Sequence, residues 1–214
     1  PSLTELTPVP VLGKNSTPSY TFNSTEAGTI TYGGSCTSLD TSAIEGDNQI
    51  TFSALLDGTY SDCSIIVTDA ASNASEALIV SAFTIETTNP TVLTLSPANS
   101  ETGVLVNPTL IMTFTKNVVA QTGNITIKKT SDNTTVETID VTSGLVTGTN
   151  SSTIIINPSS TLASQTSYYV QIAASAFDDS FGNSYSGISE TTTWQFTTVD
   201  ITPPAVTLYS PANN

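Results

Sequence analysis

The residues best suited to chemistry in this chain are oxygen ligands gathered in one short loop. Residues 178–183 read Asp-Asp-Ser-Phe-Gly-Asn, so two carboxylates and an amide lie close together in the sequence. Carboxylate and amide oxygens are the ligands that calcium prefers in proteins. Asp178, Asp179 and Asn183 are therefore candidate calcium ligands, although the loop lacks the spacing and the closing Glu of an EF-hand.

A second acidic loop lies in the first half of the chain, at residues 69–73, and offers Asp69 as a calcium ligand. A junction between two domains is a further candidate site, where Glu86 or Asp200 would act together with a neighbouring loop. The competing interpretation is that these Asp and Asn side chains form Asx-turns between strands, which is their commonest use in loops. Calcium is the only cofactor that the sequence suggests.

The residue types needed for most enzyme mechanisms are missing. The chain has no histidine, so it has neither a Ser-His-Asp nor a Cys-His arrangement. Asp178 and Asp179 are adjacent and would point in different directions in an extended segment, which does not suit the convergent pair of a glycosidase. No glycine-rich phosphate loop is present. We therefore expect a protein that is not an enzyme.

The two cysteines, Cys36 and Cys63, favour a disulfide. Closing a loop of this length would stabilise the fold by roughly 3–4 kcal/mol in the chain-entropy model. The alternative is a pair of buried free thiols in a sandwich core. A zinc site is excluded, because no histidine or further cysteine is available to complete it.

The charge balance excludes several classes of partner. The chain carries 18 acidic residues against 4 lysines and no arginine, and the acidic residues are spread along its length. Nucleic acid and anionic membrane surfaces both require a basic surface, so neither is an expected partner. No stretch of about 20 apolar residues exists, so no direct membrane insertion is expected.

One stretch occurs twice and sets the domain organisation. Residues 89–99 return as residues 203–213, and six positions match without a gap: Pro90, Val92, Ser96, Pro97, Ala98 and Asn99. A spacing of this size is a usual domain length. We therefore expect two domains, at residues 1–88 and 89–199, followed at 200–214 by a linker or the start of a further repeat.

Both domains have the residue pattern of short β-strands and no helical periodicity. In the first domain, strands are expected at 19–23, 29–32, 49–53, 60–67 and 78–86, with Cys63 facing inward. In the second, strands are expected at 91–95, 109–115, 153–157, 168–173 and 192–197, and as a hairpin at 124–128 and 136–141. Five to seven short strands in each domain indicate an antiparallel β-sandwich.

The second domain contains three aromatic residues whose positions matter. Trp194, the only tryptophan, shares a strand face with Phe196 and is expected in the core rather than on a sugar-binding surface. Phe181 and Tyr185 lie in the loop after Asp179 and are the candidates for exposed aromatic residues.

The motifs of both domains resemble bacterial immunoglobulin-like domains. In the first, the pattern Asp57-Gly58-Thr59-Tyr60 followed by residues 67–73 resembles the closing strands of that family, with Ser72 standing where the family usually has Gly. The second domain resembles the type repeated in bacterial S-layer and other surface proteins. Its matching segments are 96–99, 102–104, 113–115, 158–162, 166–168, 178–183 and 194–198.

The resemblance implies an all-β fold of two tandem immunoglobulin-like antiparallel β-sandwiches. It implies structural roles for Tyr60, as a corner tyrosine bonded to the backbone, and for Tyr168 and Trp194. It also implies an extracellular location at a bacterial cell surface and neighbouring immunoglobulin-like repeats of the same chain as partners. The expected function is a spacer in a surface or adhesin protein that holds a binding domain away from the cell. The alternative is an accessory module that itself binds a glycan or a protein ligand.

Overall fold

The computed structural model describes residues 1–205 and contains no helix among them. The chain divides into two compact units: Pro1–Asn89 with Ser180–Asn183, and Pro90–Asp179 with Ser184–Asn214. The division after Asn89 lies one residue beyond the predicted end of the first domain. The prediction that a further repeat begins at 200–214 falls largely on residues 206–214, which lie outside the described residues.

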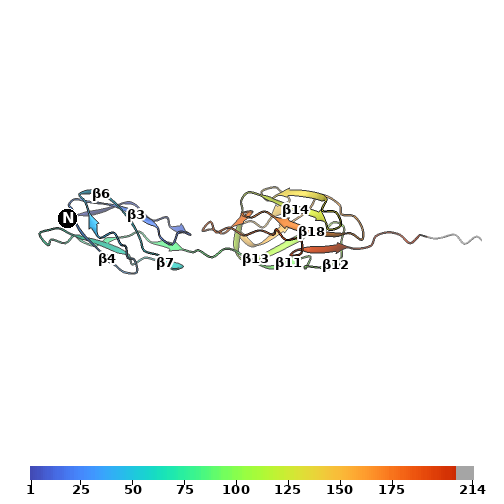
Figure 1. Cartoon of the computed structure of the whole chain (residues 1–214), viewed down its shortest axis with the longest axis horizontal. Helices are drawn as coiled ribbons and strands as arrows, with labels where there is room; N and C mark the ends of the chain where they lie inside the picture. Colours follow the sequence, from blue (N-terminus) through green and yellow to red (C-terminus); the bar gives the residue numbers. More distant parts are fainter. Residues whose placement is uncertain (206–214) are drawn as a thin grey trace, which may run out of the picture. The chain divides into compact units, whose positions relative to one another are not determined.

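The first unit is built from short strands, drawn at the blue and green end of the chain in Figure 1. They are β1 (Leu3–Thr7), β2 (Leu12–Gly13), β3 (Ser19–Ser24), β4 (Gly28–Gly33), β5 (Ser42–Ala43), β6 (Gly46–Thr51), β7 (Gly58–Tyr60), β8 (Ser64–Thr68), β9 (Leu78–Ile79) and β10 (Phe83–Ile85). Their sheets have the orders β1-β3-β6, β2-β10-β7 and β5-β4-β8-β9.

Side-chain alternation explains how these strands form one core. Tyr20 and Phe22 of β3 are fully buried, while Thr21 between them and Asn23 after them are partly exposed. On β8, Ile65 and Val67 are buried in the same way. All four buried residues belong to one hydrophobic cluster, so the sheets pack face to face as a sandwich.

The second unit is a sandwich of two larger sheets. Its strands are β11 (Val92–Ser96), β12 (Glu101–Val104), β13 (Leu110–Ala120), β14 (Asn124–Lys129), β15 (Thr135–Asp140), β16 (Val146–Thr147), β17 (Ser151–Ile156), β18 (Ser167–Ile172), β19 (Phe177–Asp178) and β20 (Gln195–Thr198). The sheet orders are β11-β13-β17-β16 and β12-β20-β18-β14-β15, with β19 pairing β13. The two sheets enclose a single core of apolar side chains.

The predicted fold class is confirmed, with local corrections. The expected strand at 60–67 is two strands, β7 and β8, with Cys63 in the connection between them, and the one at 78–86 is divided into β9 and β10. The expected hairpin is present, because β14 pairs antiparallel with β15. Two pairs of strands are parallel rather than antiparallel: β2 with β10, and β12 with β20.

Candidate functional site

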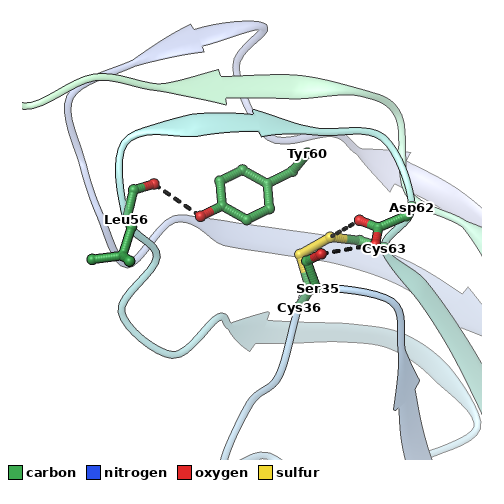
Figure 2. The surroundings of a disulfide bond; sticks show 6 residues. All are labelled: Ser35, Cys36, Leu56, Tyr60, Asp62 and Cys63. Carbon is green, nitrogen blue, oxygen red and sulfur yellow. Dashed lines mark hydrogen bonds between the residues drawn. A yellow bond between two sulfur atoms is a disulfide. The ribbon is translucent and has the colours of Figure 1, made fainter.

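The disulfide lies in the core of the first unit (Figure 2). Cys36 and Cys63 are bonded, their Cα atoms are 5.2 Å apart, and each is 1% exposed. Cys36 follows β4 and Cys63 immediately precedes β8, the neighbouring strand in the same sheet. The disulfide prediction is therefore confirmed, and the alternative of two free thiols is wrong.

Two features beside the disulfide allow its two chain segments to lie close together. Ser35 donates its hydroxyl to Asp62 Oδ2 at 2.8 Å, and this hydrogen bond lowers the pKa of Asp62. Gly34 has φ of 73°, and a Cβ atom at this position would collide with the Asp62 carbonyl. A glycine is therefore required where the segment carrying Cys36 passes the segment carrying Cys63.

Tyr60 is the corner residue that the sequence resemblance implied. Its hydroxyl donates to the Leu56 carbonyl oxygen at 2.8 Å (Figure 2). Its ring stacks on Phe83, with ring centroids 5.3 Å apart. The bond spans four residues and fixes the turn that leads from Leu56 into β7. Tyr60 therefore has a structural role.

The predicted structural aromatics of the second unit are buried and hydrogen-bonded. Trp194 is fully buried and donates its indole N–H to the Pro97 carbonyl oxygen at 2.8 Å. Tyr168 accepts the Ala163 N–H at 2.8 Å through its hydroxyl oxygen. Both predictions of a structural role are confirmed, because each buried polar atom has a partner inside the unit.

The repeated Ser-Pro-Ala-Asn motif has a structural purpose in its first copy. Besides the Pro97 contact to Trp194, Asn99 accepts the Gln195 N–H at 3.0 Å and donates its amide to the Thr192 carbonyl oxygen at 3.0 Å. These bonds tie the connection between β11 and β12 to the start of β20. The motif thus holds the connection between β11 and β12 against the segment that leads into β20.

The first of the two acidic loops uses its carboxylate within the loop. Asp69 accepts hydrogen bonds from the Ala71 N–H, the Asn73 N–H and the Asn73 side-chain amide, all at 2.8 Å. The Asn73 amide is the main cause of a lowered pKa of Asp69. Ser72 has φ of 69° and keeps the left-handed turn that a glycine would adopt more easily. This geometry is that of an Asx-turn.

The three candidate ligands of the second acidic loop have different surroundings. Asp178 pairs with Val119 across β19 and β13, and its Oδ1 atom is buried with no hydrogen-bond partner. Asp179, whose side chain is 3% exposed, lies 3.3 Å from Lys116 Nζ. Asn183 belongs to the segment that groups with the first unit, where its amide donates to the Glu86 carbonyl oxygen at 2.9 Å.

These positions leave the calcium prediction untested. Within residues 1–205, no three His, Cys, Asp or Glu side chains form a group able to hold a metal ion. Asp69 and the pair Asp178 and Asp179 lie in different units. The calcium interpretation stays a prediction, both for the loop at 178–183 and for Asp69.

The expectation of an exposed aromatic at Tyr185 is wrong. Its side chain is 6% exposed and meets Phe114 edge to face, with ring centroids 5.1 Å apart. Burial raises the pKa of Tyr185 to about 12. Phe181 is half-buried. Every aromatic side chain among residues 1–205 is buried or half-buried, so the exposed aromatic patch expected of a glycan-binding surface is missing from that part of the chain.

Sequence reasoning missed three carboxylates that bind distant backbone and hydroxyl groups. Glu5 accepts the Ser81 N–H at 3.0 Å and the Ser81 hydroxyl at 2.6 Å. Burial raises the pKa of Glu5, but the bonds from Ser81 and Tyr20 outweigh this effect, so the net pKa is lowered. The other two carboxylates are Asp57, which binds Thr87 and Thr88, and Glu137, which binds Ser159 and Ser160.

No local signal in the sequence identifies the hydrogen-bond partners of these three carboxylates. Glu5 and Ser81 are 76 positions apart, and Asp57 and Thr87 are 30 apart. In a chain so rich in Ser and Thr, each carboxylate has many equivalent hydroxyl partners until the fold selects one.

The chain is distantly similar to several solved structures. One is CopC from Methylosinus trichosporium OB3b, at 16% identity over 55% of this chain and 100% of that chain, with a TM-score of 0.40. Another is the BSP domain of a biofilm associated protein, at 12% identity over 94% of this chain but 30% of that chain, with a TM-score of 0.25. A third is the set of fibronectin(III)-like modules of Clostridium thermocellum CbhA, at 12% identity over 96% of this chain and 100% of that chain, with a TM-score of 0.31. These likenesses are too distant to carry a function across.

No curated protein matches the chain. No helix among residues 1–205 is long and apolar enough to cross a membrane. The sequence model that describes the bacterial Ig-like domain matches residues 86–198, which is more than half of the chain and contains every described strand of the second unit. Because this model covers more than half of the chain, the chain belongs to the bacterial Ig-like domain family.

Proposed function

We propose that this chain is a non-catalytic structural segment of a bacterial surface protein, and that it holds a binding domain away from the cell. The observation that carries the proposal is the way in which the link between the units is anchored. Asp57 accepts the Thr87 N–H at 3.0 Å and the Thr87 hydroxyl at 2.8 Å. This contact fixes the end of the first unit beyond β10.

The start of the second unit is anchored in its own way. The Thr91 N–H donates to the Thr115 hydroxyl at 3.1 Å, and the Thr115 N–H donates to the Thr91 carbonyl oxygen at 2.9 Å. Thr88 also donates its hydroxyl to Asp57, at 3.2 Å. Asn89 and Pro90 are therefore the residues that lie between the two anchors.

Such a link suits the transmission of force. Proline fixes its own φ angle and has no N–H, so Pro90 further restricts a connection that is already short. A link of this length is not a long flexible tether. A pulling force would pass directly from the end of one sandwich into the start of the next.

An extracellular location fits the same proposal. Disulfides persist in oxidising compartments and are rare in the cytosol, and Cys36–Cys63 is buried in the core of its unit. The net charge of −14 favours solubility and opposes binding to nucleic acid. Neighbouring Ig-like repeats of the same chain are the proposed partners.

Small-angle scattering on a linker series tests the proposal. Inserting six Gly and Ser residues between Asn89 and Pro90 would add a flexible segment of about 13 Å r.m.s. length. We expect the distance distribution of the wild type to be narrow and that of the insertion variant to broaden. The matched control carries the same insertion after Asn150, in the loop before β17. Equal distributions for wild type and linker variant would contradict the proposal.

A further inference from the structure

We propose that the free edge of β11 is a contact surface through which two copies of this chain associate. β11 ends its sheet, whose order is β11-β13-β17-β16, and pairs with β13 along one side only. No other strand within residues 1–205 pairs with its second side. An edge of this kind presents backbone N–H and C=O groups to a strand of another molecule.

The charge distribution favours this edge over the other edge strands of four or more residues. Residues 87–100 contain no charged side chain, in a chain with 18 acidic residues and 4 lysines and arginines. Among the edge strands of four or more residues within residues 1–205, β11 is the one without a carboxylate: β1 carries Glu5, β6 carries Asp47, β12 carries Glu101 and β15 carries Glu137. Because each copy has a net charge of −14, two copies repel one another least where both surfaces are uncharged.

An apolar groove beside β11 gives the partner a place to bind. The groove has a volume of about 430 Å³, and it is lined on one side by β11 and on the other by Tyr185, Ile188 and Thr193. Leu93, which also lines it, is 63% exposed. In a two-fold arrangement, the Leu93 side chain of each copy enters the groove of the other copy. The same surface therefore supplies both the inserted side chain and the groove that receives it.

Three features limit the contact to a pair of molecules. β11 is five residues long, and its register to β13 shifts between Val92 and Thr94. Pro90 and Pro97 flank it and have no N–H to donate. An isologous contact of two such short edges uses both of them, so it closes after two copies and does not extend into a fibre.

Sedimentation equilibrium of the 214-residue chain tests this inference. We expect a monomer at low concentration and a rising dimer fraction between about 10 μM and 1 mM. The dimer fraction should increase with salt, because screening weakens the repulsion between two acidic molecules. A monomer throughout this range, at low and at high salt, would overturn the inference.

A pair of charge-matched variants locates the contact. Leu93→Glu places two like charges at the proposed contact and should weaken dimerisation at least about tenfold. Leu105→Glu adds the same charge at a residue that is 70% exposed and does not line the groove, and it should leave dimerisation almost unchanged. Equal weakening by both variants would show that net charge, not the β11 edge, controls association.

Hydrogen exchange supplies a readout that does not depend on either variant. Pairing of two edges should slow the exchange of β11 amides as concentration rises, while the amides of β15, at the edge of the other sheet, keep their rates. Slower exchange at β15 without a change at β11 would move the contact to another edge and refute the proposal.

Discussion

Reduction of the Cys36–Cys63 disulfide should destabilise the first unit and leave the second unchanged. The bonded residues are 27 positions apart. In the chain-entropy model, a loop of this length stabilises the fold by about 3.5 kcal/mol, because the crosslink restricts the unfolded chain. For a unit of this size, such a loss should lower the melting temperature by about 14–28 °C.

The chain contains its own reporter for separating the two units. Its only tryptophan, Trp194, is buried in the core of the second unit, and both cysteines lie in the first. Trp fluorescence during heating therefore follows the second unit, while circular dichroism at a β-sheet band follows both. Each unit has a separate hydrophobic core, so we expect two transitions.

The experiment compares the oxidised chain with the same chain in a thiol-free reductant such as a phosphine. Reduction keeps both sulfur atoms in place and so isolates the crosslink from side-chain packing. The double variant Cys36→Ala, Cys63→Ala should be destabilised further, because both side chains are buried and their removal leaves a cavity. A shift below about 5 °C on reduction, or an equal shift of the Trp194 transition, would refute the reasoning.

Three further predictions concern the loops and carboxylates. Ser72→Gly should raise the free energy of unfolding of the first unit by about 0.5–1 kcal/mol, because glycine adopts the left-handed φ of 69° without strain. Chemical denaturation measures this free energy, and a lower value for the variant would contradict the prediction. Glu5→Gln should cost about 1 kcal/mol at pH 7, since it weakens the bonds from Ser81. The pKa of Glu5 is lowered from 4.5, so the wild-type advantage should be present above that pH and disappear as the pH falls through the lowered value; a difference that persists at pH 2 would argue against this cause. If the loop at 178–183 binds calcium, the chain should melt at a higher temperature in calcium than in EDTA. Equal melting temperatures would argue against a calcium site in this loop, where Asp179 lies beside Lys116.

Local sequence pattern was sufficient to predict which side chains enter the core. Tyr20 and Phe22 alternate with polar residues, Leu110, Met112 and Phe114 occupy every second position of their strand, and all five are buried. The inward position of Cys63 followed from its phase with Ile65 and Val67. A strand has a period of two, so neighbouring residues alone decide which of its faces is apolar.

The pattern was misleading where a strand departs from that period or where neighbours are polar. Val92 and Leu95 both pack on the core although they are three residues apart, because the register shifts within β11. Tyr185 lies in the loop after Asp179, which indicated an exposed position, but the fold places it against Phe114. The strand expected at 109–115 is longer in the structure, where β13 continues to Ala120.

The sequence alone determined that the chain is all-β, that it forms two domains, and that it lacks the histidine and the basic surface on which many functions depend. Only the tertiary structure decided which carboxylate binds which hydroxyl, as with Glu5 and Ser81, and that β12 runs parallel to β20. The reason is physical. Apolar periodicity is written in adjacent residues, whereas a hydrogen bond between residues far apart in the chain is chosen by the strand order, and many equivalent Ser and Thr partners compete until that order is set.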